Sequence, residues 1–293
     1  MPSETIQWFP GHMAKTKRVM KECLGDVDIV IELLDARIPQ SSENPQIDEL
    51  CAGKPILTIA NKSSLADEKI SAEWAKYYKS NGRKLLFIDC VSGAGVGNIM
   101  PAIKSILAEK IERYEAKGMS GRKLRAMVVG IPNVGKSSFI NRLAGGKKAR
   151  TEDRPGVTLT KQWVPTSIGL DLLDMPGVLW PKFEDKTVGE NLALTGAIRD
   201  AILDTEMLAI ILCSRLRIVA PDALAARYKL GEYEKWSSLS DRELFEYIGK
   251  KRGFLISGGE IDTERTATVL LDEFRGAKIG KITLERPEKE VEQ

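Results

Sequence analysis

The stretch Gly130-Ile-Pro-Asn-Val-Gly-Lys-Ser137 decides the fold. It matches the pattern GxxxxGK(S/T), follows an apolar run at 126–129, and opens a helical pattern over 136–143. Glycines let such a loop wrap around phosphate groups, which the backbone amides at the helix start then bind. Lys136 is placed to neutralise phosphate charge, and the Ser137 hydroxyl is placed to bind Mg²⁺. The stretch therefore predicts a phosphate-binding loop between a strand and a helix.

Two polar segments downstream add groups suited to a bound nucleotide. Asp174-Met-Pro-Gly177 ends an apolar run, so its carboxylate can hold Mg²⁺ through water and the Gly177 amide can bind the terminal phosphate. Between this segment and the loop, Thr158 offers a second hydroxyl to the metal. Arg154 is a weak candidate for an arginine finger. The remaining nucleotide contacts expected from the phosphate loop are Asn133, Val134, Gly135 and Ser138.

Alternation of strands and helices predicts an α/β fold. Short apolar runs that end in turn residues occur at 28–34, 55–60, 84–88 and 126–129, and helical patterns at 15–24, 67–81, 96–117 and 136–143 separate them. Such alternation implies a mostly parallel sheet flanked by helices, with 162–165 and 169–173 as an edge hairpin. After about residue 181 helical periodicity dominates, beginning with 188–203, and Ser240-Asp-Arg-Glu243 is typical of a capping box at a helix start. We therefore predict a sheet domain over residues 1–180 and an all-helical domain over 181–293.

The motifs that would recognise a base come before the phosphate loop. In most GTPases an NKxD sequence follows that loop, but here Asn61-Lys-Ser-Ser64 precedes it, directly after a predicted strand. The next strand leads to Cys90-Val91-Ser92 and a glycine-rich turn, where a second base-binding loop would lie. The order along the chain is therefore base motifs, phosphate loop and switch loops, which is a circular permutation of the usual order.

With these motifs the chain resembles the circularly permuted GTPases of the YlqF/RbgA type, a family of bacterial ribosome-assembly factors. The resemblance implies GTP and GDP as ligands together with Mg²⁺, hydrolysis of GTP, and a task in maturation of the large (50S) ribosomal subunit, with that subunit and its rRNA as partners. It covers nearly the whole chain, including segments 8–13, 35–39, 130–137, 153–158, 174–183, 249–253 and 257–259.

Two positions depart from the family pattern. Position 64 is Ser where the family carries Asp, and position 90 is Cys where it usually carries Ser. The Asp accepts two hydrogen bonds from guanine, and losing such a partner costs on the order of 1–3 kcal/mol. We therefore expect a weakened guanine preference, still supported by Asn61 and Lys62. Asp67 is the carboxylate that we consider as a replacement.

Hydrolysis requires a group that orients the attacking water. Many GTPases place Gln after the DxxG glycine, but this chain has Val178, which cannot orient water. The resemblance implies His12, the single histidine, as the catalytic residue beside Lys136, although a lone histidine near a terminus is more often a packing residue. The resemblance also suggests Asn133 as a ligand for K⁺.

Composition sets limits on location and partners. The chain has 293 residues, a net charge of +3, and four widely spaced cysteines without a CxxC pair. A reducing cytoplasm fits best, since no segment reads as a signal peptide or a bilayer span. We expect no membrane partner and a monomer away from the ribosome. Basic groups that could contact rRNA phosphates lie at 122–125, 147–150 and 250–252 and at Arg275, Lys278 and Lys281.

Two other functions compete with the GTPase interpretation. A P-loop kinase would phosphorylate a small molecule, but the NKxx and DxPG segments argue against it. A nucleotide-dependent RNA-binding module with negligible turnover or relaxed base specificity is the main alternative, because Val178 and Ser64 both depart from hydrolytic or guanine-specific patterns. Release of phosphate over many turnovers would separate this module from a GTPase.

Overall fold

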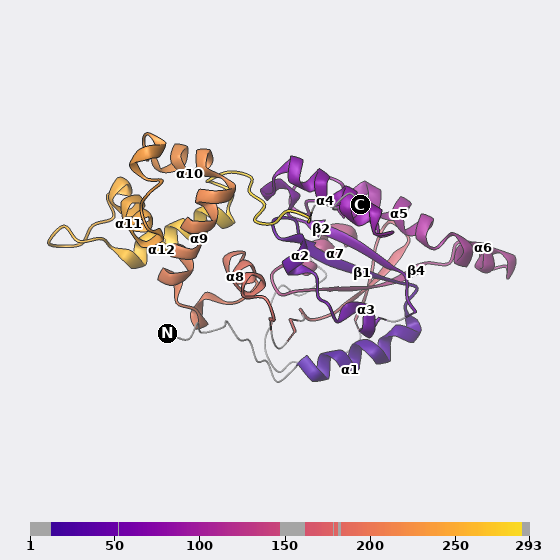
Figure 1. Cartoon of the computed structure of the whole chain (residues 1–293). Helices are drawn as coiled ribbons and strands as arrows, with labels where there is room; N and C mark the ends of the chain where they lie inside the picture. The colour runs from indigo at the N-terminus through magenta and orange to yellow at the C-terminus, as the bar shows by residue number, and fades with distance from the viewer. Residues whose placement is uncertain (1–12, 52, 147–161, 178, 181–182, 289–293) are drawn as a thin grey trace.

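The computed structural model describes residues 13–51, 53–146, 162–177, 179–180 and 183–288. A six-stranded sheet with the order β3-β2-β1-β4-β6-β5 forms one half of the molecule (Figure 1). Neighbouring strands are parallel, except that β5 runs antiparallel to β6 at the edge. The predicted α/β class and the edge hairpin are confirmed. The strands are β1 (Ile29–Asp35), β2 (Ile56–Asn61), β3 (Leu85–Phe87), β4 (Leu124–Gly130), β5 (Trp163–Pro165) and β6 (Leu170–Asp174).

The register of the sheet collects the predicted motifs at one edge. Asp35 pairs with Asn61, and Leu33 pairs with Gly130, so β1, β2 and β4 end side by side. Asp174 ends β6 next to Val128 of β4. Because parallel strands place their carboxyl ends at the same edge, the loops that follow them converge there, as expected for a ligand site in an open α/β sheet.

Helices cover both faces of the sheet, which explains why the central strands read as continuous apolar runs. Side chains alternate between the faces: Ile29, Ile31 and Leu33 belong to one core cluster, whereas Val30 belongs to another. The first cluster includes α5 and α7, the second includes α1 and α3, and α4 packs in a third. The helices of this half are α1 (Met13–Cys23), α2 (Pro39–Ser42), α3 (Ile47–Leu50), α4 (Glu68–Ser80), α5 (Ile99–Ile106), α6 (Ala108–Ala116) and α7 (Lys136–Ala144).

The second half of the molecule is built from helices (Figure 1). Ser240 and Glu243 form the capping box that the sequence predicts at the start of α11. The helices are α8 (Lys186–Leu194), α9 (Thr205–Val219), α10 (Pro221–Tyr228), α11 (Asp241–Arg252) and α12 (Thr263–Arg275). Single 3₁₀ turns lie at η1 (Leu24–Asp26), η2 (Ser63–Leu65), η3 (Val96–Asn98), η4 (Asp200–Ile202) and η5 (Tyr233–Lys235). Beyond Asp174, the described residues contain no strand, only an isolated bridge between Leu255 and Ile261.

Two predicted helices are shorter than the sequence pattern indicated. The pattern over 96–117 is interrupted at Leu107, which separates α5 from α6. The pattern over 188–203 ends at Leu194, because Gly196 follows in a left-handed conformation with φ of +81°. Among the described residues, no helix has both the length and the apolar character that crossing a bilayer requires.

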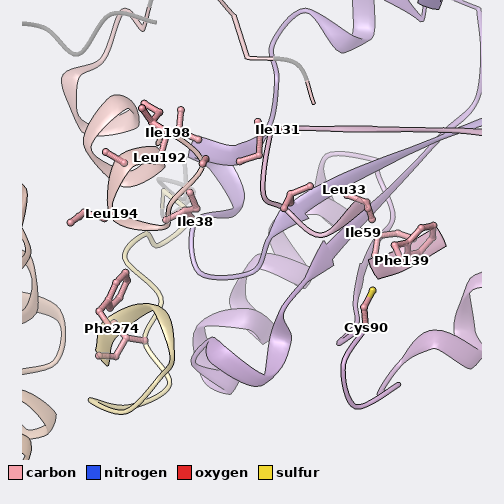
Figure 2. Packing of buried hydrophobic residues seen from close by; sticks show 14 of the residues in the cluster. Leu33, Ile38, Ile59, Cys90, Ile131, Phe139, Leu192, Leu194, Ile198 and Phe274 are labelled. Carbon is pink, nitrogen blue, oxygen red and sulfur yellow. The ribbon is translucent and has the colours of Figure 1, made fainter. Parts of the chain in front are cut away.

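The two halves share one hydrophobic core, and the chain after α12 returns from the helical half to the sheet half. Figure 2 shows Leu33 and Ile59 of the sheet in the same cluster as Leu192 of α8 and Phe274 of α12. The segment after α12 then crosses back to the sheet half, where the Leu284 amide donates to the Arg37 carbonyl at 2.9 Å. One hydrophobic cluster therefore includes residues from both sides of position 180.

Candidate functional site

The phosphate loop joins β4 to α7 in the predicted manner. The Lys136 ammonium donates to the carbonyls of Ile131 at 2.9 Å and Gly130 at 3.4 Å, so it lies inside the curve of the loop. Gly135 has φ of +102°, a conformation that side chains other than glycine rarely adopt. Ser137 lies in the first turn of α7, where amides and the helix dipole favour an anion. The local geometry is that of an anion cradle, and Ser138 beside it is exposed.

Gly177 connects the DxPG segment with this cradle. A Cβ atom at Gly177 would lie 2.8 Å from Pro132 and 2.9 Å from the Lys136 ammonium, so only glycine permits this approach. Asp174, three residues earlier, ends β6 at the same edge. Ser137 and Asp174 offer hydroxyl and carboxylate oxygens, the ligand types that Mg²⁺ prefers. The residues present therefore fit a metal-bound triphosphate.

Asn61 ties the base motif to the phosphate loop. Its side-chain nitrogen donates to the Val134 carbonyl at 2.9 Å, and its side-chain oxygen accepts from the Cys90 amide at 3.2 Å. Asn61 is buried, and its nitrogen would lie 2.3 Å from a Cβ atom at Gly135. One amide thus fixes the relative position of three loops, including the second base loop.

Asp35 holds Lys62 and Arg37 in a buried ion network. Its carboxylate accepts from the Lys62 ammonium at 2.9 Å and from Arg37 through Nη2 at 2.7 Å and Nε at 2.9 Å. Burial pushes the pKa of Asp35 upward, but the charges of Arg37 and Lys62 outweigh it and hold the pKa far below the ordinary range. Lys62 is consequently oriented by a permanently charged partner.

Arg142 of α7 binds the second base loop, which contains Cys90, Val91 and Ser92. Arg142 donates to the Cys90 carbonyl at 2.8 Å and also to the Val91 carbonyl. Burial raises the pKa of the Cys90 thiol to about 12, so the thiol stays protonated and neutral. Val91 and Ser92 are exposed, which leaves this part of the loop open to a ligand. Arg142 therefore fixes the backbone of this loop against α7.

The carboxylate nearest to position 64 belongs to Asp89. The Ser64 hydroxyl donates to Oδ2 of Asp89, and the Ser92 amide donates to Oδ1 at 2.6 Å. Asp67, our sequence-based candidate for a replacement, instead caps α4 by accepting from the amides of Lys69 and Ile70. That candidate is wrong, because a helix N-cap already engages its side chain.

The helical half contacts both the phosphate loop and the loop after β1 at one turn, residues 193–196. Asn133 donates to the Gly196 carbonyl at 2.7 Å, and Arg37 donates to the Thr195 carbonyl at 3.4 Å. Arg275 of α12 donates to the Leu194 and Ala193 carbonyls at 3.0 Å and pairs with Asp200. Arg275, which the sequence suggested as an rRNA contact, is therefore a structural residue of this turn.

Several expected site residues fall outside the described part of the chain. These are His12, Arg154, Thr158 and Val178, together with the basic group at 147–150. Conversely, the sequence patterns did not indicate three features of the site. These are the contact of Asp89 with Ser64, the contact of Arg142 with the Cys90 loop, and the buried ion pair of Asp35 with Arg37. Asp89 directly precedes Cys90, but this position alone does not indicate its contact with Ser64.

Comparison with known proteins gives a consistent result. A family model described as 50S ribosome-binding GTPase matches residues 125–243. Ribosome biogenesis GTPase A of Priestia megaterium is 49% identical over 290 residues, which cover 99% of either chain. The chain belongs to the ribosome biogenesis GTPase A family. The protein of that name from Bacillus cereus is 46% identical, over 98% of this chain and 96% of its own length.

A solved structure of the same family agrees over almost the whole length. GNP-bound YlqF from Thermotoga maritima has a TM-score of 0.62 and 27% identity, covering 94% of this chain and 99% of that one. The two chains therefore share the same fold over nearly their whole length. This member of the family is a P-loop GTPase with a circularly permuted nucleotide-binding domain.

Proposed function

We propose that this GTPase acts as a molecular switch in assembly of the large ribosomal subunit, where it binds the immature particle and its rRNA. The observation that carries the proposal is the convergence of Asn61, the phosphate loop and Gly177 at one edge of the sheet. Relatives at 46–49% identity over nearly the full chain bear names that state a ribosomal task.

In this proposal GTP binds with its phosphates in the curve of the loop. Ser137 would hold Mg²⁺ directly and Asp174 would hold it through water, and the ion would neutralise phosphate charge. Lys136 neutralises the β- and γ-phosphates, and its ammonium leaves the carbonyls of Gly130 and Ile131 to do so. Thr158 supplies the second hydroxyl to the metal, and His12 orients the attacking water. K⁺ would bind through the side-chain oxygen of Asn133, since its nitrogen donates to Gly196.

Base recognition in the proposal uses the two loops that Asn61 joins. Lys62, held by Asp35, packs its aliphatic stem along the base, and the backbone of Cys90-Val91-Ser92 approaches the base from the other side. The exposure of Val91 and Ser92 supports this placement. Ser64 lies where the family's NKxD carboxylate would be, so it contributes a hydroxyl in its place.

Switching would be transmitted through two contacts of the phosphate loop. Gly177 packs against Pro132, and Asn133 bonds the Gly196 carbonyl of the helical half. Ordering of Thr158 and Gly177 by a γ-phosphate would therefore act on a loop that already touches residues 193–196. Amide exchange compared between GDP and a non-hydrolysable GTP analogue tests this coupling, and unchanged exchange in residues 183–288 would refute it.

The helical part after residue 180 is proposed as the rRNA-binding domain, with the permuted GTPase domain before it. Lys250 and Lys251, exposed at the end of α11, are the first candidates for phosphate contacts. The protein is proposed to be cytoplasmic and monomeric away from the ribosome. The four free cysteines support the reducing compartment.

Phosphate release from GTP, with ATP alongside, tests the proposal in the presence and absence of purified bacterial large subunits. We expect GTP hydrolysis that the subunits accelerate and that Lys136→Ala abolishes. A rate that the subunits leave unchanged would contradict the ribosomal task. Binding of GTP without turnover, with or without subunits, would favour the RNA-binding module instead of a switch.

A further inference from the structure

Recognition of guanine needs an acceptor pair that Ser64 does not supply. The base presents two donors on one edge, the N1–H and the 2-amino group, and a carboxylate can accept from both. A serine hydroxyl offers a single oxygen. The NKxx motif of this chain therefore lacks its acidic member, and a second residue must provide the charge if guanine is to be preferred.

Asp89 lies in contact with the position where that charge is missing. β3 ends at Phe87, which pairs with Ala60 of β2, so the loops that follow β2 and β3 run side by side. The Ser64 hydroxyl donates directly to Oδ2 of Asp89 across these loops. The Ser92 amide binds Oδ1 at 2.6 Å and holds the carboxylate in this direction.

The Asp89 side chain is charged at neutral pH. Burial acts to raise its pKa, but hydrogen bonds from Ser64 and from Ser92 outweigh burial and lower the pKa below the ordinary value. Three other carboxylates near these loops already have partners. Asp35 binds Arg37 and Lys62, Asp67 caps α4, and Glu68 pairs with Lys281 at 2.6 Å.

A ligand can reach this corner of the site. Ser64 and Ser92 are exposed, and they border a surface hollow of about 440 Å³. The hollow is lined by Ser63, Ser64, Glu68, Ser71, Ala72, Ala75, Phe87, Asp89, Ser92, Ala94 and Lys281. Asp89 itself has little exposed surface, so its charge is only weakly screened by water. Because a hydroxyl rotates, Ser64 can turn its proton away when stronger donors arrive.

We propose that Asp89 supplies the carboxylate that reads the N1–H and 2-amino group of guanine, with Ser64 as its positioning donor. The acidic function of the base motif has thus moved from the loop after β2 to the loop after β3. Asp89 is a specificity-determining residue of the nucleotide site, and the inference rests on the proposed binding of GTP at that site.

The proposal is tested by exchanging the acceptor pair for an amide. Asp89→Asn keeps the shape and can still accept from the Ser92 amide, but one of its two oxygens becomes a donor. Xanthine carries an oxygen where guanine carries the 2-amino group, so an amide complements xanthine. Affinities for GDP, XDP and IDP are measured by displacement of a fluorescent GDP analogue from the full chain.

We expect Asp89→Asn to weaken the binding of GDP by about ten- to a hundredfold and to strengthen the binding of XDP, so that XDP binds more tightly than GDP. IDP lacks the 2-amino group and should bind the wild-type protein less tightly than GDP. The double variant Ser64→Asp with Asp89→Asn, which moves the charge to position 64, should regain the preference for GDP. Ser64→Ala, which keeps Asp89, should retain that preference.

Each contrary result has a defined meaning. If Asp89→Asn binds GDP and XDP in the wild-type ratio to within about twofold, or loses both equally, Asp89 only shapes its loop and the proposal falls. Failure of the double variant to regain GDP preference also overturns it. In these cases wild-type binding of GDP leaves the proposed GTPase function intact. A wild-type protein that binds none of the three nucleotides would overturn the proposed function itself.

Discussion

Replacing Asp35 by Asn should destabilise the protein more than any change of a surface carboxylate. Asp35 and Arg37 are both about 2% exposed, and their charged groups are joined by bonds of 2.7 and 2.9 Å. Lys62 adds a third charge at 2.9 Å. Asn keeps the shape but removes the negative charge, so the Arg37 guanidinium is left buried without a counter-ion.

The expected loss follows from that burial. Breaking a buried ion pair by removing one partner costs about 3–5 kcal/mol, because the remaining charge stays desolvated. The low pKa of Asp35 sets the pH range of the effect. A depressed pKa contributes stability that is present above the unfolded value, about 4, and is lost as pH falls toward the folded value. The difference in unfolding free energy between wild type and Asp35→Asn should therefore be largest at neutral pH and decrease in strong acid.

Urea unfolding of both proteins at neutral pH measures this difference. Asp48→Asn is the matched control, because its carboxylate is 71% exposed and lies 3.8 Å from Arg83. Exposed pairs of this kind contribute about 0–1 kcal/mol. An Asp35→Asn loss below about 1 kcal/mol, or equal to that of the control, would refute the claim that Asp35 compensates a buried guanidinium.

Two further changes test other parts of the structure. Gly135→Ala should abolish binding of a fluorescent GDP analogue, because its Cβ would lie 2.3 Å from the Asn61 amide nitrogen and φ is +102°. Gly145→Ala is the control, because nothing lies within 4 Å of a Cβ atom there. Equal binding by the two variants would contradict the steric argument. Burial and the charge of Glu43 raise the pKa of Glu32 to about 8. The stability that protonated Glu32 contributes is therefore lost as pH rises through about 8. In urea titrations, the unfolding free energy of Glu32→Gln should therefore increase relative to wild type between about pH 5 and 8. A difference in unfolding free energy that does not change with pH would contradict this.

Local patterns predicted most of the site, because they are read from consecutive residues. The phosphate loop, the strand before it and the base motif all follow from spacing and hydrophobicity, and the structure brings Asn61, Val134 and Cys90 into contact. Asp89 could not be found in this way. Its meaning depends on contact with Ser64, which is 25 positions away, and no periodicity signals such a pair.

The same limit applies to the return of the chain after α12. Its apolar residues Ile279, Ile282 and Leu284 are separated by charged or small ones, so neither a strand nor a helix is indicated. The structure nevertheless pairs the Ile282 amide with the Leu65 carbonyl and the Leu284 amide with that of Arg37. Tertiary contacts alone order this segment, and these contacts are invisible to single-sequence patterns.

That returning segment has a consequence for how the chain is made. Glu285 accepts from the amides of Gln40 and Ser41 at the start of α2, and Ser41 and Glu285 are 244 positions apart. At a synthesis rate of about 5–20 residues per second, roughly 10–50 s pass between the two. During that interval α2 has no carboxylate at its start, and Trp74 cannot donate to the Glu285 carbonyl. The nucleotide-binding half is thus completed only by the final part of translation. A chain that ended before residue 282 would lack the contacts that this segment makes with Leu65, Arg37 and α2, next to the base motif.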